Sequence, residues 1–114
     1  MKAIRLHQFG GPEVLRLEEL PAPQAGPGQV LVRARAIGVN PVDTYFRSGS
    51  NPAIQPPWTP GLDAAGEIET VGDGVRHMRA DDRVYTGGSV TGAYAEFILC
   101  TAAQVHPLPA HLSF

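Results

Sequence analysis

A dense run of polar side chains follows the longest strand-like pattern in the chain. The segment GVNPVDTYFRSG, residues 38–49, places Asn40, Asp43, Tyr45 and Arg47 within eight positions. An amide, a carboxylate, a phenol and a guanidinium together can donate and accept hydrogen bonds and hold charge. The residues alone favour a plainer interpretation, a helix cap followed by an amphipathic turn, because caps are common and active sites are rare.

Metal binding has little support in the residue pattern. The histidines, His7, His77, His106 and His111, fall on different predicted elements, and the only cysteine, Cys100, falls in or just after a strand. No pair has ligand spacing on a common helix or knuckle. We therefore expect no metal site and no disulfide, and we interpret Cys100 as a small buried apolar residue.

Phosphate-binding loops are also missing from the sequence. Gly72-Asp73-Gly74 begins a glycine-rich fingerprint, but His77 stands where a third glycine is needed, and no helical pattern follows. A tight turn is the favoured interpretation.

Composition narrows the partners and the compartment. The chain has 114 residues, with 11 acidic and nine basic side chains and a net charge of −2, and no basic stripe stands out. Nucleic acid and anionic membranes are therefore poor partners. The first residues lack the apolar stretch of a signal peptide, so none is expected, and no stretch is long enough for a membrane-spanning helix. With a single cysteine, a reducing cytoplasm is the expected location.

Most of the chain shows period-two alternation or short apolar runs, which indicate strands. We predict strands at residues 2–7, 14–20, 29–39, 61–71, 82–86, 93–99 and 104–108. Turn signals separate them, so the fold class is mainly β, a closed or nearly closed antiparallel barrel.

One short helix interrupts the strands. Asn40 is its predicted N-cap, Pro41 its first residue and Asp43 an acid in its first turn, and Gly49 ends it. Residues 51–60 contain four prolines, which forbid a helix or a central strand, so a surface or cleft loop is expected there.

Five segments taken together resemble a known family. FGGPEVL (9–15), GVNPVDTYFRSG (38–49), TPGLDAAGEIETVGDGV (59–75), DRVYT (82–86) and GAYAEF (92–97) are similar, in this order, to signatures of the quinone oxidoreductase (zeta-crystallin) subfamily of medium-chain dehydrogenases/reductases. The resemblance implies a GroES-like, partly open β-barrel with one or two short helices over residues 1–114. It also implies a Rossmann nucleotide-binding domain that is absent from this chain.

The resemblance implies an activity and a site. Members of the subfamily pass a hydride from NADPH to a quinone or a conjugated carbonyl, and the fragment alone would be inactive. Asn40, Pro41 and Tyr45 would contact the nicotinamide and its ribose. Asp43 would orient Tyr45 or simply cap the helix. Arg47 would meet the cofactor's charge or form a surface ion pair.

The resemblance also implies that zinc is not used. Zinc-dependent relatives carry a cysteine where this chain has Asn40, and a histidine where it has Leu62 in Gly61-Leu62-Asp63. Thiolate and imidazole ligands are what hold the ion in such sites.

Three positions depart from the family or stay ambiguous. Asn51 stands where relatives often carry a tyrosine on the cleft wall, which leaves acceptor specificity open. Trp58 would line the acceptor pocket or, as its size favours, fill space beneath the proline-rich loop. Asp82 replaces a glycine, which affects a turn.

Two other functions are compatible with these patterns. One is a zinc-free enoyl or alkene reductase of the same superfamily. The other is a GroES-like barrel that serves interactions without catalysis, because fold alone does not fix function. The full-length enzyme is expected to be a cytoplasmic homodimer.

Overall fold

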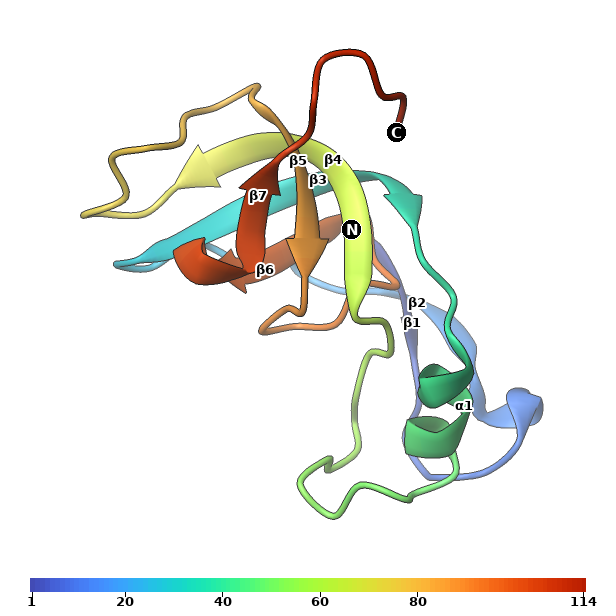
Figure 1. The fold of residues 1–114 in the computed structure, drawn as a ribbon. Helices are drawn as coiled ribbons and strands as arrows, with labels where there is room; N and C mark the ends of the chain where they lie inside the picture. The colour runs from blue at the N-terminus through green and yellow to red at the C-terminus, as the bar shows by residue number, and fades with distance from the viewer.

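The computed structural model describes all 114 residues, and strands dominate it. A five-stranded antiparallel sheet has the order β6-β3-β4-β5-β7, and a separate two-stranded sheet pairs β1 with β2. In Figure 1 the larger sheet curls into an open barrel, and β1, β2 and the helix α1 form a smaller lobe beside it. The predicted fold class, a mainly β, partly open barrel, is confirmed. The strands are β1 (Lys2–Arg5), β2 (Arg16–Glu19), β3 (Gln29–Ile37), β4 (Asp63–Val71), β5 (Arg83–Gly87), β6 (Phe97–Thr101) and β7 (Val105–Pro107).

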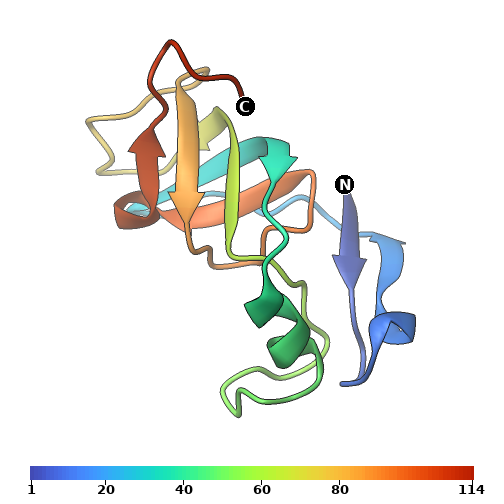
Figure 2. The same cartoon turned by 45° about the vertical axis from the view of Figure 1, so that its right-hand side comes forward.

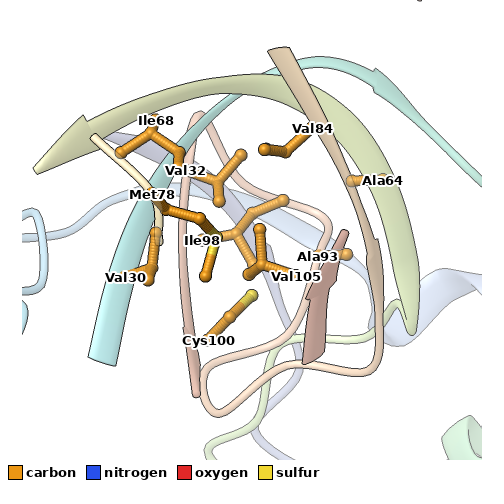
Figure 3. Packing of buried hydrophobic residues seen from close by; sticks show 10 residues of the cluster. All are labelled: Val30, Val32, Ala64, Ile68, Met78, Val84, Ala93, Ile98, Cys100 and Val105. Carbon is orange, nitrogen blue, oxygen red and sulfur yellow. The ribbon is translucent and has the colours of Figure 1, made fainter. Parts of the chain in front are cut away.

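An apolar cluster fills the inside of the curled sheet. Side chains alternate inward along β3 and β4, so that Val30, Val32 and Ile68 lose all exposure to solvent. Cys100 belongs to this cluster and is fully buried, which confirms its apolar role. Figure 3 shows the side chains of the cluster pointing toward one another: Val30, Val32, Ala64, Ile68, Met78, Val84, Ala93, Ile98, Cys100 and Val105.

The two longest strands, β3 and β4, approach each other very closely at one point. Their register shifts between Leu31 and Val32 and again between Ala34 and Ala36, as in β-bulges. A Cβ atom at Gly66 would overlap the backbone carbonyl of Arg33. Only glycine allows this approach of the two strands.

All seven predicted strands are present, but the bounds of each differ in the structure, by one or two residues in most cases. Residues 14–20 begin with a 3₁₀ turn, Pro12–Val14, and the strand starts only at Arg16. The strand predicted at 93–99 runs instead from Phe97 to Thr101.

The shift of that strand has a physical reason. Residues 93–96 make a crossing between the two sheets. The Tyr94 N–H donates to the Pro60 carbonyl, and the Ile4 N–H donates to the Tyr94 carbonyl. On the other side of the crossing, the Ala34 N–H donates to the Glu96 carbonyl. This backbone seam joins the small lobe to the larger sheet.

The helix α1 (Pro41–Arg47) lies where predicted, with Asn40 as N-cap and Pro41 as first residue. Ser48 caps its end, and Gly49 follows with a φ of 97°, a conformation that favours glycine. Figure 2 shows α1 below the larger sheet, with the loop of residues 51–60 around its lower end and β1 to its right. No helix of the structure has the length and apolar character needed to cross a membrane.

Candidate functional site

Asn40 lies in the link between β3 and α1, and its two ends are held separately. Its backbone is extended, with φ −117° and ψ 150°, which turns the chain from the strand into the helix. Its side-chain Nδ2 donates to Oδ1 of Asp63 at 2.5 Å, and its backbone N–H donates to Oδ2 of Asp43 at 2.9 Å. Two aspartates from different elements therefore fix this residue.

Asp43 is the only buried residue of the helix, with 4% of its surface exposed. Its Oδ2 atom accepts hydrogen bonds from the Asn40 backbone and from the Tyr94 hydroxyl, which lies 2.9 Å away. Its Oδ1 atom is buried without a partner in the protein. The carboxylate thus caps the helix and also ties it to the crossing segment around Tyr94.

Tyr94 closes this polar network from the β1 side. Burial, and next its hydrogen bond to Asp43, raises the pKa of Tyr94 from the ordinary value of 10.0 to about 12. The phenol therefore stays protonated at neutral pH and serves as a donor to Asp43.

Tyr45 lies on α1 but outside this network. The residue is 60% exposed, and its hydroxyl makes no hydrogen bond within the protein. Val39, which precedes Asn40, is 78% exposed. A free phenol and an apolar side chain thus stand on either side of Asn40 in the sequence, available to a ligand or to another protein surface.

Arg47 faces the N-terminal loop. Its Nε donates to the Gly10 carbonyl at 3.2 Å, and the Gly10 N–H donates back to the Arg47 carbonyl at 3.0 Å. The structure therefore gives Arg47 a role in holding the helix end. Its proposed contact with the cofactor stays a prediction.

Asn51 and Trp58 do not join Asn40 in the hydrogen-bonded cluster. The Asn51 side chain accepts the Ala53 N–H in its own loop. Trp58 pairs with Leu6 through the backbone and packs edge-on against Phe46, with ring centroids 6.4 Å apart. This packing beneath the loop matches the space-filling role that its size favours, and the role of both residues in an acceptor pocket stays a prediction.

Two residues of the cluster, Asp63 and Tyr94, were not predicted as site residues. Asp63 follows the position at which zinc-dependent relatives carry a histidine, and a lone acid at the start of a small, apolar strand was an available signal. Tyr94 lies between two buried alanines, Ala93 and Ala95, so its side chain points to the opposite face of the segment. Nothing in that alternation indicates a contact with Asp43, 51 residues away.

The cluster can bind polar groups, and its residues show no metal-ligating arrangement. Nowhere in the chain do three or more His, Cys, Asp or Glu side chains gather closely enough to hold a metal ion. The accessible groups at the start of α1 are the free end of the Asn40 amide and the Tyr45 hydroxyl. These can accept and donate hydrogen bonds to a neutral polar ligand.

Comparison with known proteins places this geometry in a family. Residues 26–110 match the model of the alcohol dehydrogenase GroES-like domain. The rat quinone oxidoreductase is 51% identical over the whole chain, and quinone oxidoreductase 1 of Escherichia coli is 40% identical over 97% of it. The crystal structure of an Escherichia coli quinone oxidoreductase complexed with NADPH superposes with a TM-score of 0.96 at 39% identity, over all of this chain and 35% of that one.

The chain spans about 35% of the length of the curated relatives it matches. The matched family model covers most of the chain, including β3, α1 and the Asn40–Asp63 pair. The resemblance in sequence motifs, the curled sheet and the capped helix all lead to the same result. The chain belongs to the alcohol dehydrogenase GroES-like domain family, with quinone oxidoreductases among its relatives.

Proposed function

We propose that this chain forms the barrel side of the hydride-transfer site of a zinc-independent NADPH:quinone oxidoreductase. The observation that carries the proposal is that a fixed amide, Asn40, and a free phenol, Tyr45, lie close together in the sequence at the start of α1. The Asn40 amide is held at one end by Asp63, and the Tyr45 hydroxyl is free and exposed on the next turn. The identity to quinone oxidoreductases along the whole chain supports the same activity.

The residues fit the nicotinamide end of NADPH. Asn40 offers a hydrogen-bond acceptor beside the exposed apolar Val39, and Pro41 has no N–H that a ligand would leave unpaired. Arg47 is already bound to Gly10, and no glycine-rich phosphate loop is present. The phosphates therefore need a site elsewhere, as in the Rossmann arrangement.

NADPH, when bound, supplies the hydride. The protein's part is to orient it and to meet the negative charge that develops on the oxygen of the acceptor. The Tyr45 hydroxyl is the accessible neutral donor that suits this role. The Asn40 amide holds the nicotinamide end of the cofactor. Quinones accept electrons readily, so a modest electrostatic contribution suffices without a metal Lewis acid.

A chimaera tests this proposal. The chain replaces the matching N-terminal third of Escherichia coli quinone oxidoreductase 1, and NADPH-dependent quinone reduction is measured beside reduction of an enone. Tyr45→Phe is expected to lower kcat/KM for the quinone by about a hundredfold to a thousandfold, the range for losing a donor that acts in the transition state. Asn40→Ala is expected to lower it by about tenfold, the size of one hydrogen bond lost to the cofactor. Tyr85→Phe, an exposed phenol in β5, is the matched control and keeps its activity.

Unchanged kinetics in both site variants would refute the assignment of Asn40 and Tyr45. Preference for enones over quinones would instead support the alkene reductase. Stoichiometric zinc in the purified chimaera, measured by elemental analysis, would contradict the zinc-independent mechanism.

The chain by itself gives a second test. Because its residues fit only one end of the cofactor, isothermal titration calorimetry of the 114-residue chain with NADPH is expected to detect negligible binding. Tight binding would show that the phosphate site lies within this chain.

A further inference from the structure

The orientation of the Asn40 amide follows from the chemistry of its neighbour. The two ends of an asparagine amide have nearly the same shape, so a partner must determine which end faces it. Asp63, when ionised, can only accept hydrogen bonds. The Asn40 atom that lies 2.5 Å from Asp63 Oδ1 must therefore be the Nδ2 donor.

This contact leaves the other end of the amide free. The Asp43 N–H faces the Asn40 side chain in a capping-box arrangement, but it donates to the Asn40 carbonyl at 3.0 Å, and no side-chain hydrogen bond caps the helix. The Asn40 Oδ1 atom is not among the buried atoms that lack a partner, so part of it is open to a ligand. Asp63 thereby converts an ambiguous amide into one that presents an acceptor outward.

Asp63 is itself held firmly. It is the first residue of β4, paired with Gly87 of β5, and its carbonyl accepts the Gly38 N–H at 2.9 Å. Its carboxylate lies over the Cα of Gly38, where a Cβ atom would be 2.6 Å from Oδ2. The glycine therefore provides the space in which the carboxylate sits.

The backbone of Asn40 is fixed from the opposite side. Its N–H donates to Asp43 Oδ2, and that same oxygen accepts the Tyr94 hydroxyl. With the backbone held by Asp43 and the amide held by Asp63, neither translation nor rotation of the Asn40 side chain is free.

We infer that Asp63 is a positioning residue, which turns Asn40 Oδ1 toward the ligand as a fixed hydrogen-bond acceptor. The inference rests on the proposed function for the identity of that ligand. The group recognised is then an N–H or O–H donor at the nicotinamide end of NADPH, a carboxamide N–H or a ribose hydroxyl. Asp63 acts through Asn40 and does not touch the reacting atoms.

The first experiment uses the chain alone and needs no cofactor. The chain has two asparagines, Asn40 and Asn51, so their side-chain NH₂ signals are readily assigned in a ¹⁵N spectrum. In the unmodified chain, one Nδ2 proton of Asn40 is expected to be shifted downfield and protected from exchange with water. Asn51, whose amide nitrogen has no partner of this kind, is the internal reference.

Two variants remove the contact in independent ways. Asp63→Leu deletes the acceptor, and Gly38→Ala displaces it by filling the space beneath it. Both are expected to abolish the downfield shift and the protection of Asn40. Asp73→Asn, an exposed aspartate in the turn after β4, is the matched control. If Asn40 keeps its shift and protection in both variants, while backbone signals show them folded, the inference is overturned.

The second experiment uses the chimaera. Asp63→Leu is expected to raise KM for NADPH about tenfold, the size that follows from losing one hydrogen bond to a ligand, with KM for the quinone unchanged. Asp63→Asn retains shape and an acceptor but can also donate, so it permits both amide orientations and gives a smaller rise. A KM for NADPH that is no higher in Asp63→Leu than in Asp73→Asn would overturn the inference.

The two experiments separate this inference from the proposed function. If the unmodified chimaera reduces no quinone while the spectra show that Asp63 fixes Asn40, the proposed function fails and the positioning contact stands. If the chimaera is active and the spectra show no dependence of Asn40 on Asp63, the positioning role fails and the proposed function stands.

Discussion

The curled sheet and the helical lobe are stabilised in different ways. Inside the sheet, the buried cluster consists of apolar side chains, such as Val32 and Ile68, without a charged member. In α1, the one buried residue is a carboxylate, Asp43, while Tyr45 and the preceding Val39 are exposed. The sheet therefore folds around the burial of apolar surface. The lobe also buries apolar side chains, Ala3, Leu6 and Val14, but directional hydrogen bonds hold the start of α1 in place.

This difference separates the residues that keep the fold from the residues that make the site. The burial of apolar side chains does not depend on the angle at which they meet, whereas hydrogen bonds to a carboxylate fix the positions of the atoms that donate them. Substitutions in the sheet should thus change stability, and substitutions at the surface of α1 should change binding. The backbone seam at Tyr94 is where the two regions meet, and it should show both effects.

The largest effect is expected where β3 and β4 approach each other. Gly66→Val would drive a side chain into the Arg33 carbonyl and prevent the sheet from closing. We expect loss of the cooperative thermal transition measured by circular dichroism. Gly87→Val, in β5, where a Cβ meets no atom within 4 Å, is the matched control and should fold. A Gly66→Val chain with an unchanged melting temperature would show that the close approach is unimportant.

A smaller effect sharpens the contrast between core and lobe. Ile68→Ala removes a fully buried side chain and is expected to lower the free energy of unfolding by about 2–5 kcal/mol. Tyr45→Ala, at an exposed position, should change it by no more than about 0.5 kcal/mol. Urea denaturation measures both. Equal losses in the two variants would remove the distinction between the regions.

The smallest effect is expected at the seam and appears at high pH. Because the pKa of Tyr94 is raised to about 12 in the fold from 10.0, the unfolded chain releases this proton first. The contribution of Tyr94 to the free energy of unfolding is therefore fully present below pH 10 and is lost as the pH rises toward 12.

Tyr94→Phe tests this assignment. The variant lacks the titrating group, so its stability should fall less steeply than that of the unmodified chain between pH 10 and 12, as followed by thermal unfolding. Tyr85→Phe is the matched control, and its profile should follow the unmodified chain. Identical slopes for Tyr94→Phe and the unmodified chain would contradict the role of the Tyr94–Asp43 contact.

Local patterns in the sequence predicted the elements well where one physical rule dominated. Alternation placed β3, the Asn-Pro-x-Asp signal placed the start of α1 and Gly49 placed its end, because caps are determined by adjacent residues. The strand at 93–99 was misplaced because hydrogen bonds to Pro60 and Ile4, distant in sequence, redirect its first half. Its alternating pattern is equally compatible with either course.

Only those residues of the site that lie in one segment of the sequence were predicted. Asn40 and Asp43 lie three residues apart and were found together. Asp63 and Tyr94 contact them across 23 and 51 residues, a relation that no local periodicity encodes. Arg47 was predicted to meet the cofactor's charge or to form a surface ion pair. Its hydrogen bond to the Gly10 carbonyl was not predicted, because a backbone acceptor carries no residue-specific signal.

The wedge of the Asp63 carboxylate over Gly38 makes these two positions mutually dependent. A methyl group at 38 demands a shorter residue at 63, so Gly38→Ala and Asp63→Ser should be better tolerated together than their separate costs add up to. Natural or engineered variants of this chain would then have to change residues 38 and 63 together. Selection that preserves the contact between Asn40 and its ligand would therefore also preserve Gly38, although Gly38 itself does not touch the ligand.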